Sequence, residues 1–143
     1  AWISITLYIL LPNEYYKGIA FSYFKNTEKA YNSFKIAYSQ HPYNLDVINN
    51  YATILTFKNR LEEAKKLYRK ILEISPKHID ANMNLASILF NEKKYNEAYQ
   101  LMCNIDFQNK NDRYTNVLRN VLAKRIINEY GNSKDDVLKE NKT

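Results

Sequence analysis

Few residues in this 143-residue sequence have the type and spacing that chemistry requires. The two histidines, His41 and His78, each lie close to a proline, and neither is at metal-ligand spacing from a cysteine or carboxylate set. The single cysteine, Cys103, cannot form an internal disulfide, and we expect it to be a small buried apolar side chain. The sequence contains no glycine-rich phosphate loop, nucleophile elbow or paired acid signature. It therefore predicts no catalytic residue, no cofactor and no metal site.

A group of basic residues near the middle of the chain is the other chemical candidate. Glu62 and Glu63 are interspersed among these cations, which favours a solvated helix face over a phosphate-binding patch. The formal net charge of +6 is moderate, because fifteen acidic residues offset the basic ones. RNA binding, which would show a steep salt dependence, is thus a weaker hypothesis than protein binding. The basic residues are Lys58, Arg60, Lys65, Lys66, Arg69 and Lys70.

The composition predicts the elements that must position any such residues. Apolar residues make up 45% of the chain, enough to bury a core, and the length suits a single domain. Only two glycines and three prolines occur, too few for the turns of a β-sandwich or β-meander. We therefore expect an all-α protein.

A repeat with a period of 34 residues organises the helices. Pro42 and Pro76 define the period, and four other columns of residues recur at the same interval. Two columns contain small side chains, one contains large ones, and one changes from alanine to isoleucine. The columns are Gly18, Ala52 and Ala86; Ala30, Ala64 and Ala98; Phe34, Tyr68 and Met102; and Ala37, Ile71 and Ile105.

This pattern resembles the tetratricopeptide repeat, whose 34-residue unit has small residues, an aromatic residue and a proline at these positions. The resemblance implies a right-handed α-solenoid of three helical hairpins, with repeats at 11–44, 45–78 and 79–112. The sequence departs from the family pattern at position 4, where Glu14, Ile48 and Asn82 replace the usual tryptophan, and Lys110 replaces the third proline. Because a lone hairpin is marginally stable, we expect each unit to depend on its neighbours.

The remaining segments are predicted to flank this stack. Residues 113–130 keep a helical period but lose the repeat columns, which is typical of a capping helix, and 131–143 form a polar tail. Residues 1–10 are an apolar N-terminal stub, in which Ile3, Ile5, Leu7 and Ile9 alternate with more polar residues as in an extended strand. The stub is too short to span a bilayer.

In the tetratricopeptide family the first helix of each hairpin lines a concave groove, and the resemblance implies a peptide groove here. Asn50 and Asn84 are one repeat apart and could form a ladder that grips a peptide main chain. Of the carboxylate clamp that some family members use, only Asn50 is present, and Asp46 and Asp80 would repel a carboxylate. A neutral or basic ligand segment is therefore favoured. The predicted groove residues are Tyr15, Tyr16, Ile19, Tyr23, Asp46, Asn49, Asn50, Thr53, Phe57, Asp80, Met83, Asn84, Ser87 and Phe90.

The sequence thus predicts a non-catalytic scaffold that binds another protein or peptide in its groove. The alternative is the soluble tail of a membrane-embedded bacterial polysaccharide polymerase of the O-antigen ligase type, which a short similarity around Tyr15–Gly18 and His41–Ala52 suggests. Membrane attachment would then require a region upstream of Ala1. Compartment, oligomeric state and the identity of the partner are not predicted.

Overall fold

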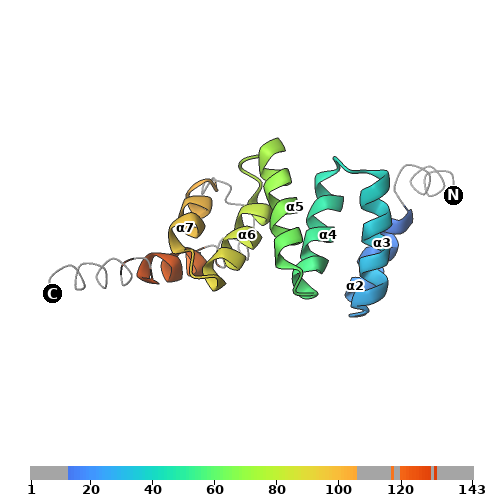
Figure 1. The fold of residues 1–143 in the computed structure, drawn as a ribbon, viewed down its shortest axis with the longest axis horizontal. Coiled ribbons are helices and arrows are strands. Elements are labelled where there is room, and N and C mark those ends of the chain that lie inside the picture. The colour runs from blue at the N-terminus through green and yellow to red at the C-terminus, as the bar shows by residue number, and fades with distance from the viewer. Residues whose placement is uncertain (1–12, 106–116, 118–119, 130, 132–143) are drawn as a thin grey trace. The chain divides into compact units, whose positions relative to one another are not determined.

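The computed structural model describes residues 13–105, 117, 120–129 and 131, and these residues form helices and turns without any strand. The all-α prediction is therefore confirmed for this part of the chain. The predicted stub at 1–10 lies outside the described residues, as does the predicted tail apart from Gly131, which is helical. The helices are α2 (Asn13–Tyr23), α3 (Thr27–Gln40), α4 (Leu45–Phe57), α5 (Leu61–Ile74), α6 (Ile79–Asn91) and α7 (Tyr95–Cys103), and residues 120–129 are also helical (Figure 1).

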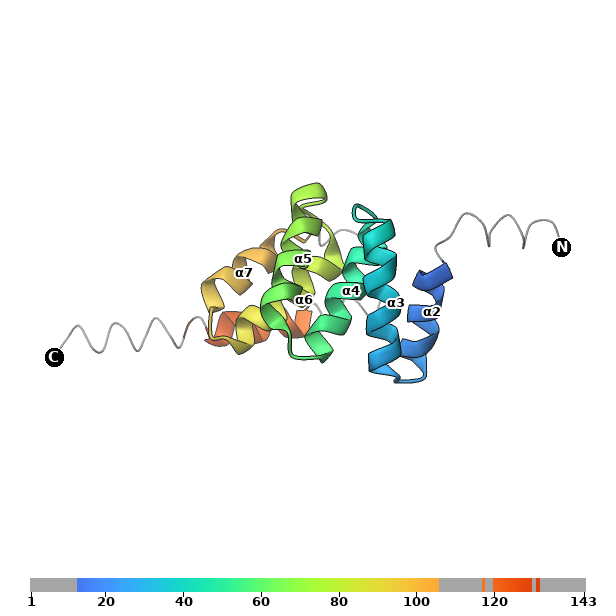
Figure 2. The same cartoon turned by 45° about the vertical axis from the view of Figure 1, so that its right-hand side comes forward.

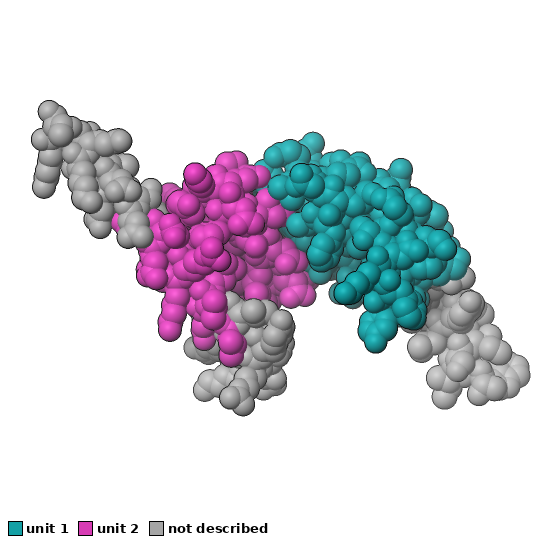
Figure 3. Space-filling view, turned by 90° about the horizontal axis from the view of Figure 1, so that it is seen from below, with its two compact units in different colours: residues 1–71 teal, residues 72–143 magenta. Residues whose placement is uncertain are grey.

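The chain divides into two compact units, residues 1–71 and 72–143 (Figure 3). The division of the sequence falls within the last turn of α5. The first unit contains α2, α3, α4 and most of α5, and the second contains α6, α7 and the helical residues 120–129. Within the units, α2 lies beside α3 and α6 lies beside α7 (Figures 1 and 2). Each predicted repeat contains two helices, although the repeat boundaries stay predictions.

The residues of all four 34-residue columns are buried. Ala30, Ala64 and Ala98 have no exposed surface, and neither have Ala52 and Ala86. Gly18, the corresponding residue of α2, is buried against the ring of Phe34. The larger members of the columns, from Phe34 to Ile105, are at most 2% exposed. The recurring side-chain sizes therefore mark the helix surfaces that pack together.

Three helices begin with a side chain that accepts a hydrogen bond from the backbone N–H three residues later. Asn26 and Asn44 use Oδ1 at 3.2 and 3.1 Å, and His78 uses Nδ1 at 3.2 Å. Such N-caps satisfy backbone donors that have no partner within the helix. The position of His78 beside a proline thus has a structural explanation.

A left-handed residue closes each hairpin turn. Lys25, Asn59 and Lys93 have φ angles of 57°, 58° and 61°, and they are spaced by the same 34 residues. The next residue in each turn donates its backbone N–H to the carbonyl five residues earlier, at 2.8 to 2.9 Å. This is the hydrogen bond of a Schellman motif, which usually places glycine at the left-handed position. Because no glycine occurs at these three positions, the turns were not predicted from the sequence.

Cys103 is exposed, so the prediction that it is buried is wrong. It is the last residue of α7, and the preceding residue, Met102, fills the buried position of that turn. Residues adjacent on a helix point about 100° apart, so only one of the two can face the interior.

Replacing Lys93 with glycine should stabilise the protein. A side chain in the left-handed region is sterically disfavoured, and its removal should gain about 1 kcal/mol in the free energy of unfolding. The measurement is urea unfolding followed by circular dichroism. Lys66→Gly is the control, because Lys66 is an exposed residue inside α5, where glycine should cost about 1 kcal/mol. Destabilisation by Lys93→Gly would contradict the assigned turn.

Candidate functional site

The predicted groove residues of the first unit lie on α2 and α4, and each of them is exposed or half-buried. Tyr16, Ile19, Tyr23 and Phe57 are 45%, 40%, 82% and 76% exposed. On α2 these residues recur every three or four positions, so they share one helix face. The polar residues of α4 follow the same spacing. Asp46 is exposed, while Asn49, Asn50 and Thr53 are half-buried.

A hydrogen bond joins the two helices on this face. The Nδ2 atom of Asn50 donates to the Oη atom of Tyr15 at 3.1 Å, and both residues are half-buried. The ring of Tyr15 makes edge contacts with Phe34 and Tyr16, with centroid distances of 6.1 and 5.3 Å. Burial raises the pKa of Tyr15, and the negative charge of Asp46 raises it further. Tyr15 is thus packed against neighbouring rings, and its Oη atom accepts the hydrogen bond that holds the Asn50 amide.

Thr53 links the same face to α5. Its Oγ1 atom donates to the carbonyl oxygen of Asn49 at 2.9 Å and lies 3.2 Å from the Oη atom of Tyr68. Because Tyr68 is 1% exposed, this contact anchors the face to the interior of the unit. The backbone of α4 is therefore held in place beneath the exposed aromatic residues.

A hollow of about 390 Å³ opens between α2, α3 and α4. Phe34 and Ile54, which are almost fully buried, contribute apolar surface, and the exposed ring of Phe57 borders the opening. Three predicted groove residues line it, whereas Lys25 was missed, because it lies in the hairpin turn and not on a first helix. The lining residues are Ser22, Lys25, Thr27, Phe34, Asn50, Thr53, Ile54 and Phe57.

The second unit carries the predicted groove residues of α6. Asp80 and Ser87 are exposed, and Met83 and Asn84 are half-buried. The ring of Phe90 lies 5.3 Å from that of Tyr95, and the guanidinium of Arg125 lies 5.0 Å above it. Phe90 is thus partly covered by residues of its own unit. The ladder of Asn50 and Asn84 has one member in each unit, and it stays a prediction.

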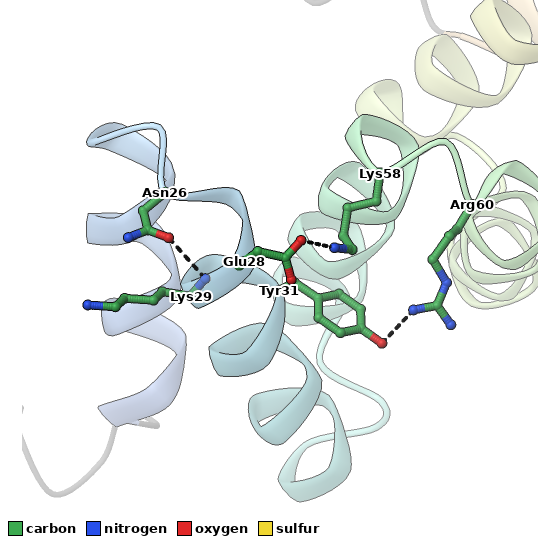
Figure 4. A network of polar contacts seen from close by, with 6 residues as sticks. All are labelled: Asn26, Glu28, Lys29, Tyr31, Lys58 and Arg60. Atoms are coloured by element: carbon green, nitrogen blue, oxygen red, sulfur yellow. Dashed lines mark hydrogen bonds and ion pairs between the residues drawn. The ribbon is translucent and has the colours of Figure 1, made fainter.

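The basic residues predicted to form a solvated face are in part held by contacts with tyrosines and acids. Arg60 donates to the Oη atom of Tyr31 and pairs with both carboxylate oxygens of Glu63 at 2.7 Å. Lys58 pairs with Glu28 and lies 5.0 Å above the Tyr31 ring (Figure 4). The hydrogen bond from Arg60 lowers the pKa of Tyr31. These contacts connect α3 to the turn that follows α4.

Tyr38 of α3 is held by Lys70 of α5, whose ammonium donates to the Tyr38 Oη atom at 3.0 Å and lies 4.8 Å from the Tyr43 ring. The ring of Tyr51 packs 5.5 Å from that of Tyr38, and burial raises the pKa of Tyr51 to about 12.

Lys65 is 3% exposed and pairs with Glu62 at 2.7 Å. Of the six basic residues, Lys66 and Arg69 are exposed. Most of the cluster therefore stabilises the packing of helices and is not arranged around a phosphate.

Within the described residues, no group of three or more histidine, cysteine or acidic side chains could hold a metal ion. In the same part of the chain, none of the helices combines the length and the apolar character needed to cross a membrane.

Tyr15→Phe should destabilise the protein without unfolding it. The half-buried Asn50 would lose its acceptor, which should cost about 1 kcal/mol in the free energy of unfolding. Tyr23→Phe is the matched control, because the Tyr23 side chain is 82% exposed and should tolerate the same change. Chemical denaturation of both variants measures the difference, and equal stability would show that the Tyr15 hydrogen bond is not a structural link.

Comparisons with known proteins agree with this architecture. A family model described as "Tetratricopeptide repeat" matches residues 58–121. A tetratricopeptide repeat protein of known structure from Parabacteroides merdae is similar to the chain, with a TM-score of 0.66 and 21% sequence identity. The similarity covers 82% of this chain and 46% of that protein, so the chain spans less than half of its length. Comparison with curated proteins gives no match. The repeat columns, the paired helices and these similarities together show that the chain has the fold of a tetratricopeptide repeat protein.

Proposed function

We propose that this protein is a binding module that holds a short extended peptide against α2 and α4 of its first unit. Stacked helical repeats offer extended surfaces that commonly bind other proteins. The proposal depends chiefly on one observation: the aromatic residues Tyr16 and Tyr23 of α2 and Phe57 of α4 are exposed. Large exposed aromatic side chains supply much of the binding energy at protein interfaces.

The amide of Asn50 is oriented for a peptide main chain. Its Nδ2 atom donates to Tyr15, which fixes the plane of the amide and leaves Oδ1 as the atom that can accept from a peptide N–H. Since Tyr15 is itself packed against Phe34, the amide is held before any ligand arrives. Such preorganisation lowers the entropy that binding costs.

The charges on this face favour a ligand with a neutral or basic group near the start of α4. Asp46 lies in the first turn of α4 and is exposed, as is Asp80 at the start of α6 in the second unit. An exposed carboxylate attracts a cationic side chain and repels an acidic one. The comparisons give no support to the alternative of a membrane polymerase tail.

Selection from a library of displayed peptides tests the proposal. The full chain should enrich peptides, and Phe57→Ser should weaken the binding of the enriched peptides at least tenfold because it removes an exposed aromatic anchor. Tyr43→Ser is the control, because Tyr43 has the same 76% exposure but lies in the turn before α4 and contacts Lys70. Circular dichroism verifies that both variants fold.

Two outcomes would contradict the proposal. One is the absence of any enriched peptide. The other is equal loss of binding in Phe57→Ser and Tyr43→Ser, which would place the ligand elsewhere on the protein.

A further inference from the structure

We infer that the hollow between α2, α3 and α4 selects a bulky apolar side chain in the ligand, flanked by a basic residue on one side and an acidic residue on the other. This inference rests on the proposed function and specifies the class of peptide. It draws on the lining of the hollow and on the positions of two exposed charges, Lys25 and Asp46.

The hollow has the size and chemistry for one large apolar side chain. Its volume of about 390 Å³ is at the small end of the range for ligand pockets. Phe34 and Ile54 are 1% and 5% exposed, so they form a fixed apolar floor, and Phe57 can close over the edge of an inserted side chain. Burying an aliphatic or aromatic side chain here removes its apolar surface from water, which favours binding.

Two polar groups in the wall can hold the main chain beside that side chain. Asn50 and Thr53 line the hollow, and both are fixed by hydrogen bonds within the unit. The apolar side chain would therefore enter next to a main-chain segment that Asn50 can contact. Binding of the apolar side chain in the hollow and binding of the main chain by Asn50 would therefore occur together.

The charges at the two ends of the face set the direction of the ligand. Lys25 follows the C-terminal end of α2, lines the hollow together with Phe57, and is exposed. Asp46 lies at the opposite end of α4, eleven residues before Phe57. At 1.5 Å per residue this separation is about 16 Å. An extended peptide covers about 16 Å with five residues. A ligand with its acidic residue at Lys25 should thus carry its basic residue about five positions away, near Asp46.

Synthetic peptides test this directly. The probe is an acetylated and amidated peptide, Lys-Gly-Ser-X-Gly-Glu, in which X is alanine, leucine or phenylalanine, and its binding to the full chain is measured by fluorescence polarisation. Leucine or phenylalanine at X should bind at least tenfold more tightly than alanine. In Ser22→Trp, where a large ring fills the hollow from an exposed position, this difference should vanish, whereas Ser22→Ala should keep it.

A second variant tests the charges without filling the hollow. Lys25→Glu should weaken the peptide that ends in Glu and strengthen one in which Lys replaces that Glu. The change leaves the apolar wall intact, so the preference for leucine over alanine should remain. Unchanged charge preference in Lys25→Glu would overturn the assigned direction.

The failure of this inference can be distinguished from that of the proposed function. If library peptides bind the Phe57 face but X shows no apolar preference, or the preference survives in Ser22→Trp, the hollow is not a specificity pocket. If neither the library nor the synthetic peptides bind, the proposed function itself fails. Concentration-dependent self-association that Ser22→Trp abolishes would instead assign the hollow to a second copy of the chain.

Discussion

The structure depends on the close approach of antiparallel helices at positions where one side chain is small. Gly18 shows the constraint most clearly, because a Cβ atom built there would lie 2.7 Å from the ring of Phe34. Carbon atoms pack at about 3.5–4.0 Å, so the ring can occupy its place only opposite glycine. Ala52 and Ala86, the equivalent residues of the later hairpins, have no exposed surface. The 34-residue period of the sequence thus reflects where small side chains allow two helices to pack closely.

The proposed binding face follows from this packing. Because α2 and α4 bury their small residues against the second helices, their remaining faces carry Tyr16, Tyr23 and Phe57 toward solvent. A different set of contacts holds the hairpins of the first unit together, in which Lys58 and Arg60 lie over the ring of Tyr31 (Figure 4). Cation–π contacts of this kind are worth about 0.5–1 kcal/mol at exposed sites. The cation–π contacts around Tyr31 and the proposed binding face therefore involve different side chains.

Side-chain size and periodicity were sufficient to predict the helices and the buried columns, because both are properties of spacing along the chain. Contacts between distant residues were not predictable in this way. Nothing in the sequence indicates that Arg60 donates to Tyr31, or that Lys25 lines a hollow with Phe57. The left-handed turns were also missed, since Lys25 and its equivalents replace the expected glycine and the folded hairpin imposes the strained φ angle.

A double-mutant cycle at Gly18 and Phe34 tests the steric constraint most directly, with the free energy of unfolding as the measurement. In a solvated helix Gly→Ala would stabilise by about 1 kcal/mol, but here Gly18→Ala should destabilise by about 1–3 kcal/mol because the added methyl group meets the Phe34 ring. In the Phe34→Leu background the same change should cost much less, giving a coupling energy of at least about 1 kcal/mol. Equal effects of Gly18→Ala in both backgrounds, or stabilisation in the wild-type protein, would contradict the account.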